Sequence, residues 1–194
     1  MSFDLRERKR TKTRFMIQTE ALRLFEEKGY GRTTVEEIAE AAAISPRTFF
    51  RYFPTKEDVV MWDEVDPLVG ELVEARPDDE PVAETLRAVI RESLGALYER
   101  DPERLLARVR LLATVPELRA RFLEEQAQGV EVLAPLLSPT RDADDLALRV
   151  ICASMLGAVW VALDLWQRDG GRSTLLDTLD RAIDSLAGGM RELS

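Results

Sequence analysis

The segment 33–56, TTVEEIAEAAAISPRTFFRYFPTK, constrains the fold of this chain more than any other. Thr33 or Thr34 can cap a first helix, because glutamates lie three residues further on and complete a capping box. The apolar residues that follow recur at helical spacing and predict one buried stripe: Val35, Ile38, Ala39 and Ala42. The segment therefore begins with a short amphipathic helix.

A second short helix follows a turn at Ala43. Ser45 is a suitable N-cap, and Pro46 suits the first helical position, where the missing N–H costs nothing. Phe49 and Phe53 are four residues apart and are expected to point inward. The opposite face carries two cations and a hydroxyl, a combination suited to base edges and phosphates in a major groove: Arg47, Thr48 and Arg51.

Residues 39–59, AEAAAISPRTFFRYFPTKEDV, resemble the helix-turn-helix signature of the TetR family of transcriptional regulators. That signature reads A-x-x-A-G-V-S-x-x-T-hydrophobic-Y-x-Y-F-x-x-K-x-x-L, and the matching residues are Ala39, Ala42, Ser45, Thr48, Tyr52, Phe53 and Lys56. The resemblance implies a DNA-binding module. We expect its DNA contacts from Thr33, Thr34, Ser45, Pro46, Arg47, Thr48, Phe50, Arg51, Tyr52 and Lys56.

Two residues depart from the signature. Ala43 stands where the family usually has glycine, so a left-handed turn there would be strained by roughly 1–2 kcal/mol. Phe50 replaces a tyrosine whose hydroxyl meets a phosphate in the family, so the resemblance does not carry that contact over. Neither departure removes the fold signal.

Charge is divided unevenly along the chain, whose net charge is −9. Residues 1–56 hold 12 Lys or Arg against 8 Asp or Glu, whereas residues 57–194 hold 15 against 28. The basic part is the part with the helix-turn-helix, and this asymmetry bears on nucleic-acid contact more than the total does.

Six cations precede or open the first predicted helix: Arg6, Arg8, Lys9, Arg10, Lys12 and Arg14. They form either a solvated tail or an arm along the DNA backbone, and the neighbouring helix-turn-helix favours the arm. Lys56 lies at the start of a fourth helix capped by Thr55, where the helix dipole disfavours a cation. A bound phosphate would explain it, and a lysine extending into water is the alternative.

From Val82 onward every long segment has helical period, and none has strand alternation. We predict an all-α fold of about nine helices. Residues 1–56 would form a three-helix helix-turn-helix DNA-binding domain, and residues 57–194 a helical ligand-binding and dimerisation bundle. The fourth helix is expected to continue past Trp62 and to break at Pro67.

The predicted helix 143–168 is apolar on two sides, so both must be covered. Its bulkier side includes Cys152, expected to be a buried small hydrophobe, and its other side is mostly small and permits close helix approach. Either one subunit covers both sides or a second copy covers one. The resemblance implies dimerisation through the last two helices, with the expected interface residues Ser154, Gly157, Ala158, Val161, Leu179, Ile183 and Leu186.

Composition weighs against an enzyme and against a membrane protein. The chain has no histidine, which removes the usual general base and the commonest metal ligand. We therefore predict no catalytic residue, no metal and no cofactor. A single cysteine fits a reducing cytoplasm. Nothing resembles a signal peptide, and the apolar run 150–163 is too short to span a bilayer, so we expect a cytoplasmic protein without membrane contact.

The aromatic residues of the C-terminal part are either ordinary core or the lining of a ligand cavity. Residues 105–122, LLARVRLLATVPELRARF, resemble the effector domain of TetR-type regulators grouped by acyl-CoA-like ligands. If the ligand carries a phosphate or thioester head, Arg108 or Arg110 is the expected cation for it, although the stem of Arg108 can also cover apolar surface. The expected pocket residues are Trp62, Tyr98, Arg108, Phe122, Met155 and Trp160.

The sequence is thus identified as that of a TetR-like homodimeric transcriptional regulator. Its expected function is that of a repressor that binds a palindromic double-stranded operator and is released by a small apolar or acyl-type effector. A helical adaptor whose basic module docks an acidic protein is the alternative.

Overall fold

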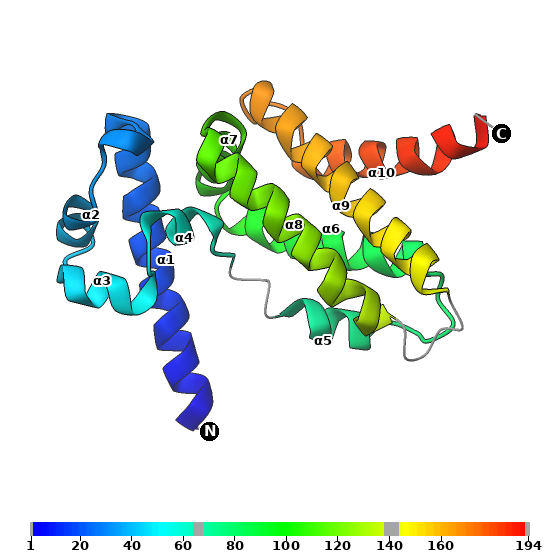
Figure 1. Cartoon of the computed structure of the whole chain (residues 1–194), viewed down its shortest axis with the longest axis horizontal. Coiled ribbons are helices and arrows are strands. Elements are labelled where there is room, and N and C mark those ends of the chain that lie inside the picture. The colour runs from blue at the N-terminus through cyan, green and yellow to red at the C-terminus, as the bar shows by residue number, and fades with distance from the viewer. Residues whose placement is uncertain (1, 64–67, 138–143, 193–194) are drawn as a thin grey trace. The chain divides into compact units, whose positions relative to one another are not determined.

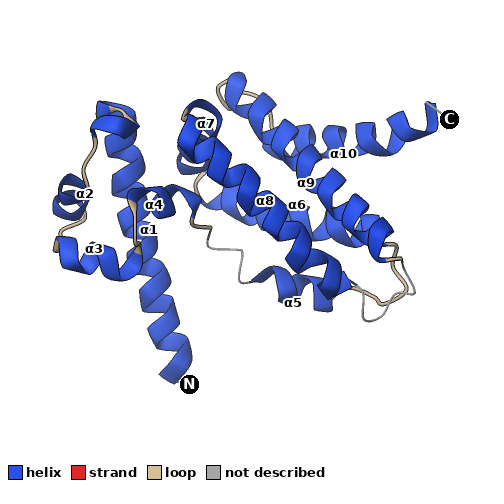
Figure 2. Cartoon of the chain, in the orientation of Figure 1, coloured by secondary structure: helices blue, strands red, loops and turns tan. Residues whose placement is uncertain are grey.

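The computed structural model describes residues 2–63, 68–137 and 144–192, and within them the chain is helical without a strand (Figures 1 and 2). The predicted all-α class is confirmed. The described elements are α1 (Ser2–Lys28), the 3-10 turn η1 (Tyr30–Arg32), α2 (Val35–Ala41), α3 (Pro46–Tyr52), α4 (Lys56–Met61), α5 (Val69–Glu74), α6 (Val82–Arg100), α7 (Pro102–Thr114), α8 (Pro116–Leu137), α9 (Asp145–Arg168) and α10 (Leu175–Glu192).

The chain forms two compact units. The first holds residues 1–64 together with Leu111–Arg119, and the second holds Val65–Arg110 and Ala120–Ser194. A domain boundary at residue 56 stays a prediction, and α4 lies within the first unit.

In the first unit, α1 packs against η1, α2 and α4, and α2 packs against α3. The inward positions predicted for the helix-turn-helix are buried, with Ile38 and Phe49 fully so. Ile17 and Phe25 of α1 are buried in the same unit. Burial of such large apolar side chains contributes about 1.5–3 kcal/mol each. It stabilises the short helices α2, α3 and α4, which would not be stable alone.

The end of α4 differs from prediction. α4 ends at Met61 and does not continue past Trp62, whose φ of −57° and ψ of 129° are extended. The separate helix α5, which belongs to the second unit, brings the count among the described residues to ten α-helices, in agreement with the predicted number of about nine. The predicted break at Pro67 lies outside the described residues. The basic residues 6–14 belong to α1, which begins at Ser2, so they are helical, and their contact with the DNA backbone stays a prediction.

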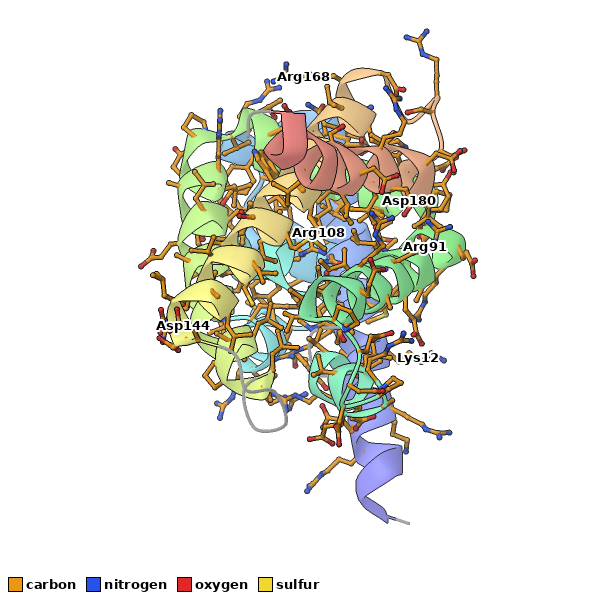
Figure 3. The ribbon with its side chains drawn as sticks, turned by 90° about the vertical axis from the view of Figure 1, so that its right-hand side faces the viewer. Lys12, Arg91, Arg108, Asp144, Arg168 and Asp180 are labelled. Carbon is orange, nitrogen blue, oxygen red and sulfur yellow. The ribbon has the colours of Figure 1, made fainter. Side chains whose placement is uncertain are left out.

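The second unit is organised around α9, which packs against α6 and α10. Its core includes the bulkier side of α9, with Cys152, Met155 and Trp166 buried. α10 is joined to α6 by the ion pairs Arg87–Asp184 and Arg91–Asp180, the second of which is labelled in Figure 3. The core of the second unit therefore covers the bulkier side of α9.

By length and composition, α9 is the one helix among the described residues that could cross a membrane. A third of its apolar window is buried inside the chain. A core helix of a folded domain passes the same test, and the buried Cys152 and Trp166 place α9 in such a core.

Candidate nucleic-acid interface

The turn between α2 and α3 has a conformation that the sequence predicted. Ala43 has a φ of 52°, the left-handed region that favours glycine. The N–H of Ala43 donates to Glu40 O at 3.0 Å, and the N–H of Ile44 donates to Ala39 O at 2.9 Å. These two bonds form a Schellman motif that satisfies the last carbonyls of α2. The strain at Ala43 is therefore offset by a complete helix end.

Both helices of the motif are capped as predicted. Thr34 Oγ1 accepts from the N–H of Glu37 at 3.2 Å, and Glu37 Oε2 accepts from the N–H of Thr34 at 2.9 Å. Ser45 Oγ accepts from the N–H of Thr48 at 3.1 Å, with Pro46 at the first position of α3. The caps fix the start of α3, which sets the direction in which its outer side chains project.

The outer face of α3 is exposed and cationic. Arg47 and Arg51 are exposed on the side opposite the buried Phe49, and Phe50 is exposed beside them. The Thr48 hydroxyl lies 2.9 Å from Ser45 Oγ, so it is held at the helix start. The guanidinium of Arg51 lies 5.2 Å from the ring centre of the half-buried Tyr52.

Thr33, which we expected to contact DNA, has a structural role instead. Its side chain is buried, and its hydroxyl donates towards Gly29 O at 3.1 Å and Leu24 O at 3.3 Å. Such a hydroxyl joins the end of α1 to the start of α2 and has no surface with which to touch DNA. Thr34, the actual N-cap, is exposed.

Lys56 is held by the protein at the start of α4. Its Nζ donates to Tyr30 O at 3.0 Å and to Thr33 O at 3.3 Å, and it lies 4.4 Å from the ring centre of Tyr30. The Tyr30 hydroxyl in turn donates to Glu57 Oε1 at 2.7 Å. An ammonium group has three protons, so this arrangement orients Lys56 and leaves one donor for an external acceptor.

The same cluster sets the charge of Glu57. Partial burial alone would raise the pKa of the Glu57 carboxyl, but bonds from the Tyr30 hydroxyl, from backbone and from Thr55, with the charge of Lys56, lower it overall. Glu57 therefore stays ionised, and its hydrogen bond holds the Tyr30 ring next to Lys56 Nζ.

Two side chains of α1 that sequence reasoning did not assign a structural role organise the ends of α3 and α4. Gln18, which is buried, donates from Nε2 to Val59 O at 2.7 Å and to Trp62 O at 2.9 Å. Arg14 donates to Tyr52 O at 3.4 Å. A polar residue on the same helical face as buried Ala21 and Phe25 was the available signal for Gln18.

Arg14 also lies between two aromatic rings. Its guanidinium carbon is 5.6 Å from the ring centre of Phe53 and 5.9 Å from that of Trp62, the residues at which α3 and α4 end. Burial and the nearby charge of Arg10 lower the pKa of Arg14. Arg14 is thus a packing residue of the module.

The predicted dimer residues divide between two environments. Gly157 and Val161 are exposed, and Ser154, Ala158 and Leu186 are half-buried. Leu179 and Ile183 are buried in the chain's own core, which leaves their side chains no surface for a second copy. On α9 the exposed positions continue as an apolar row, which we call the α9 row: Leu146, Val150, Gly157, Val161 and Leu165.

The six predicted pocket residues are divided between the two units. Trp62 belongs to the first unit, where its ring centre lies 6.1 Å from that of Phe53. In the second unit, Phe122 of α8 packs on Trp160 of α9 with ring centres 4.9 Å apart. The remaining three also lie in the second unit: Tyr98 packs against Trp166, Met155 is buried in the core, and Arg108 is half-buried on α7.

The described residues contain no group of three or more His, Cys, Asp or Glu side chains that could bind a metal ion. Cys152 is fully buried, and this burial raises the pKa of its thiol. It is a small core residue, as its position on an apolar helix predicted.

Comparison with known proteins gives matches along most of the chain. Residues 17–61 match the family "Bacterial regulatory proteins, tetR family", and residues 80–191 match the "MftR C-terminal domain". The first match covers the helix-turn-helix described above. The second covers more than half of the chain and begins near the start of α6.

Individual relatives also match the chain along most of its length. The transcriptional regulator TcmR of Streptomyces glaucescens is 32% identical, over 94% of this chain and 86% of TcmR. The transcriptional repressor KstR2 of Rhodococcus jostii is 31% identical, over 86% of this chain and 84% of KstR2. The structure of FadR from Thermus thermophilus, a repressor solved in complex with lauroyl-CoA, has a TM-score of 0.58 and 27% identity, covering 91% of this chain and 94% of that one.

These relatives are regulators of transcription, and their similarity extends across both units of the structure. The capped helix-turn-helix, its cationic outer face and the matched C-terminal helices agree with one another. The chain belongs to the TetR family of DNA-binding transcriptional regulators.

Proposed function

We propose that the protein is a cytoplasmic, non-catalytic repressor that binds a twofold-symmetric operator as a homodimer and leaves it when an acyl-CoA binds. The observation that carries the proposal is the outer face of α3, where Arg47 and Arg51 project from a helix held by complete caps. Arginine in this position recognises guanine in the major groove and neutralises phosphates.

The proposed roles follow the surroundings of each residue. Arg47, near the start of α3, reads a base edge, whereas Lys56, already oriented by two carbonyls, donates its remaining proton to a phosphate. Exposed neighbours on the same surface complete the contact: Thr34, Ser45, Pro46, Phe50 and Arg51, with half-buried Thr48 and Tyr52 beside them.

The α9 row supports the homodimer. An apolar stripe of this length on a helix is rarely left in water, and a twofold-related copy of itself is a self-complementary cover. Gly157 lies in its middle, and the space where its side chain would project is open, so that another helix could approach closely. Two subunits joined there would need to present their recognition helices about 34–36 Å apart.

The effector proposal rests on similarity to the Thermus FadR, whose structure contains lauroyl-CoA. A long acyl chain would bind in residues 57–194 among apolar side chains, with half-buried Arg108 as the cation for the phosphate-bearing head. To move the population from almost wholly DNA-competent to almost wholly incompetent, the ligand must bind the incompetent conformation about 5.5 kcal/mol more tightly than the competent one. Burial of several methylene groups, at about 0.8 kcal/mol each, is sufficient.

Two experiments test the function. Selection of duplexes from a random pool by the purified protein should enrich one inverted-repeat sequence, and enrichment of none would contradict the operator-binding function. Lauroyl-CoA titrated into the protein–operator complex should then lower the fluorescence anisotropy of labelled DNA, while free coenzyme A should not.

Arg108→Ala should weaken the response to lauroyl-CoA, whereas Arg168→Ala, at the exposed end of α9, should respond like the unmodified protein. An operator complex that no acyl-CoA releases would refute the effector and leave the DNA-binding function standing.

A further inference from the structure

Phe50 is the one exposed aromatic side chain among the residues whose side chains the structure describes, with half of its surface accessible. Its ring meets that of Phe49 edge to face, with ring centres 5.6 Å apart and planes at 88°. One side of the Phe50 ring thus packs on Phe49, while the rest of the ring projects from α3. A recognition helix that keeps a large apolar group in water has a surface that favours an apolar partner.

The partners of this ring are restricted by its neighbours. Arg47 lies three residues earlier and therefore beside Phe50 on the helix surface, and Arg51 follows it directly. Both cations are exposed, so the ligand that covers this surface is anionic and is DNA in this family. Phe50 itself has no hydroxyl and cannot hydrogen-bond to a phosphate.

Among the base edges of the major groove, only thymine offers an apolar group, its C5 methyl. A phenyl ring beside an arginine can cover that methyl while the arginine binds the adjacent guanine. Cytosine, adenine and guanine present donors or acceptors that an apolar ring would leave unpaired.

We propose that Phe50 selects thymine at one position of each operator half-site by covering its C5 methyl group, next to the base read by Arg47. This inference rests on the proposed operator-binding function and adds a specific base to it. It gives Phe50 a role that a phosphate-binding tyrosine at this position would not have.

Uracil tests the contact directly, because it pairs as thymine does and lacks only the methyl. An operator selected by the purified protein would be prepared with each thymine replaced in turn by uracil, symmetrically in both half-sites. At one position, replacement of thymine by uracil should weaken binding about fourfold for each methyl removed, or about fifteenfold for the symmetric pair. This is the effect expected for loss of one buried methyl group in each half-site. No loss at any position would overturn the proposal.

Protein variants assign the effect to Phe50. Phe50→Ala should bind the thymine and uracil operators equally, whereas Phe50→Leu, which keeps an apolar side chain, should still prefer thymine. Met16→Ala removes an exposed apolar side chain from α1 in the same unit and should prefer thymine as much as the unmodified protein does. A thymine preference unchanged in Phe50→Ala would assign the methyl to another residue.

Two further readouts separate base contact from a structural role. Phe50→Ala should leave the salt dependence of binding unchanged, because no cation is lost, and should leave binding to random duplex nearly unchanged. Equal losses on operator and random DNA, with a lowered melting temperature, would mean that Phe50 acts only through the fold. Absence of any selected operator would instead contradict the proposed function itself.

Discussion

The side-chain nitrogen of Gln18, in the middle of α1, donates a 2.9 Å hydrogen bond to the carbonyl oxygen of Trp62, the C-cap residue of α4. A second bond of 2.7 Å reaches Val59 O, and Gln18 is only 1% exposed. Water has little access to this amide, so α1 itself satisfies carbonyls at the end of α4. This contact joins the C-terminal end of α4 to the middle of α1.

Gln18→Met keeps the length of the side chain but removes both donors, leaving two carbonyl groups of α4 without their bond. We expect a loss of about 1–3 kcal/mol in the free energy of unfolding of the first unit. Hydrogen exchange of the α1 and α4 amides measures this directly. Gln126→Met is the matched control, because half-buried Gln126 makes a single, longer bond of 3.3 Å to Leu156 O. A Gln18→Met protein as well protected as the parent would show that the bonds do not determine stability.

Ala43→Gly should stabilise the protein, by up to about 1 kcal/mol. The left-handed φ of 52° strains an alanine by roughly 1–2 kcal/mol, and glycine removes the strain while losing some entropy in folding. Chemical denaturation of the two proteins gives the difference. Ala41→Gly, at the last residue of α2, is the control and should destabilise the protein. Destabilisation by both substitutions would argue against strain at Ala43.

Arg47→Ala and Lys56→Ala should weaken DNA binding in different ways. Loss of a base contact at Arg47 should cost about 1–3 kcal/mol on the selected operator and much less on random duplex. Loss of a phosphate contact at Lys56 should weaken both alike and reduce the salt slope by about one per subunit. Fluorescence anisotropy at several salt concentrations separates the two. If Arg47→Ala binds both duplexes equally poorly, Arg47 does not read a base.

Gly157→Arg should convert a dimer into a folded monomer. The space around Gly157 is open, so that the subunit accommodates the new side chain, but a second copy on the α9 row would meet a buried charge. Light scattering reports the mass, and circular dichroism reports the fold. Asp177→Arg, on the exposed side of α10, should remain dimeric. A dimeric Gly157→Arg protein would place the subunit contact elsewhere.

Stability of the first unit should fall in acid through Glu37. A hydrogen bond from Lys28 and one from the backbone of Thr34 lower the pKa of Glu37 from 4.5 to about 2. A lowered folded-state pKa stabilises the protein above the unfolded value, so this contribution is complete above pH 4.5 and is lost as the pH falls through 2. Glu37→Gln, which keeps the capping geometry, should be less stable at pH 6. The difference should disappear near pH 2, and a constant difference would exclude the charge as its cause.

Local signals predicted the caps, the turn and the outer face of α3, because each depends on residues within a few positions of one another. The N-cap roles of Thr34, Ser45 and Thr55, and the strained turn at Ala43, are of this kind. Apolar periodicity also distinguished the bulkier side of α9 from its smaller side, since a helix face is defined by spacing alone.

Periodicity does not say which chain covers a face. Leu179 and Ile183 belong to an apolar stripe that the sequence left available for a second copy, and the subunit itself buries them. The roles of Arg14 and Gln18 were missed for a related reason, since their partners lie 38 to 44 residues away along the chain. Long-range pairs of polar groups leave no periodic trace.

The caps and α1 contacts also separate the residues that build α3 from those that remain open to substitution. Ser45 and Pro46 start the helix, Phe49 anchors it, and its last carbonyl is bound by Arg14. The exposed side chains that carry none of these duties are Arg47, Phe50 and Arg51. A library randomised at these three positions alone would vary the preferred DNA sequence while retaining the scaffold, which makes this short helix a compact cassette for engineering operators and their repressors together.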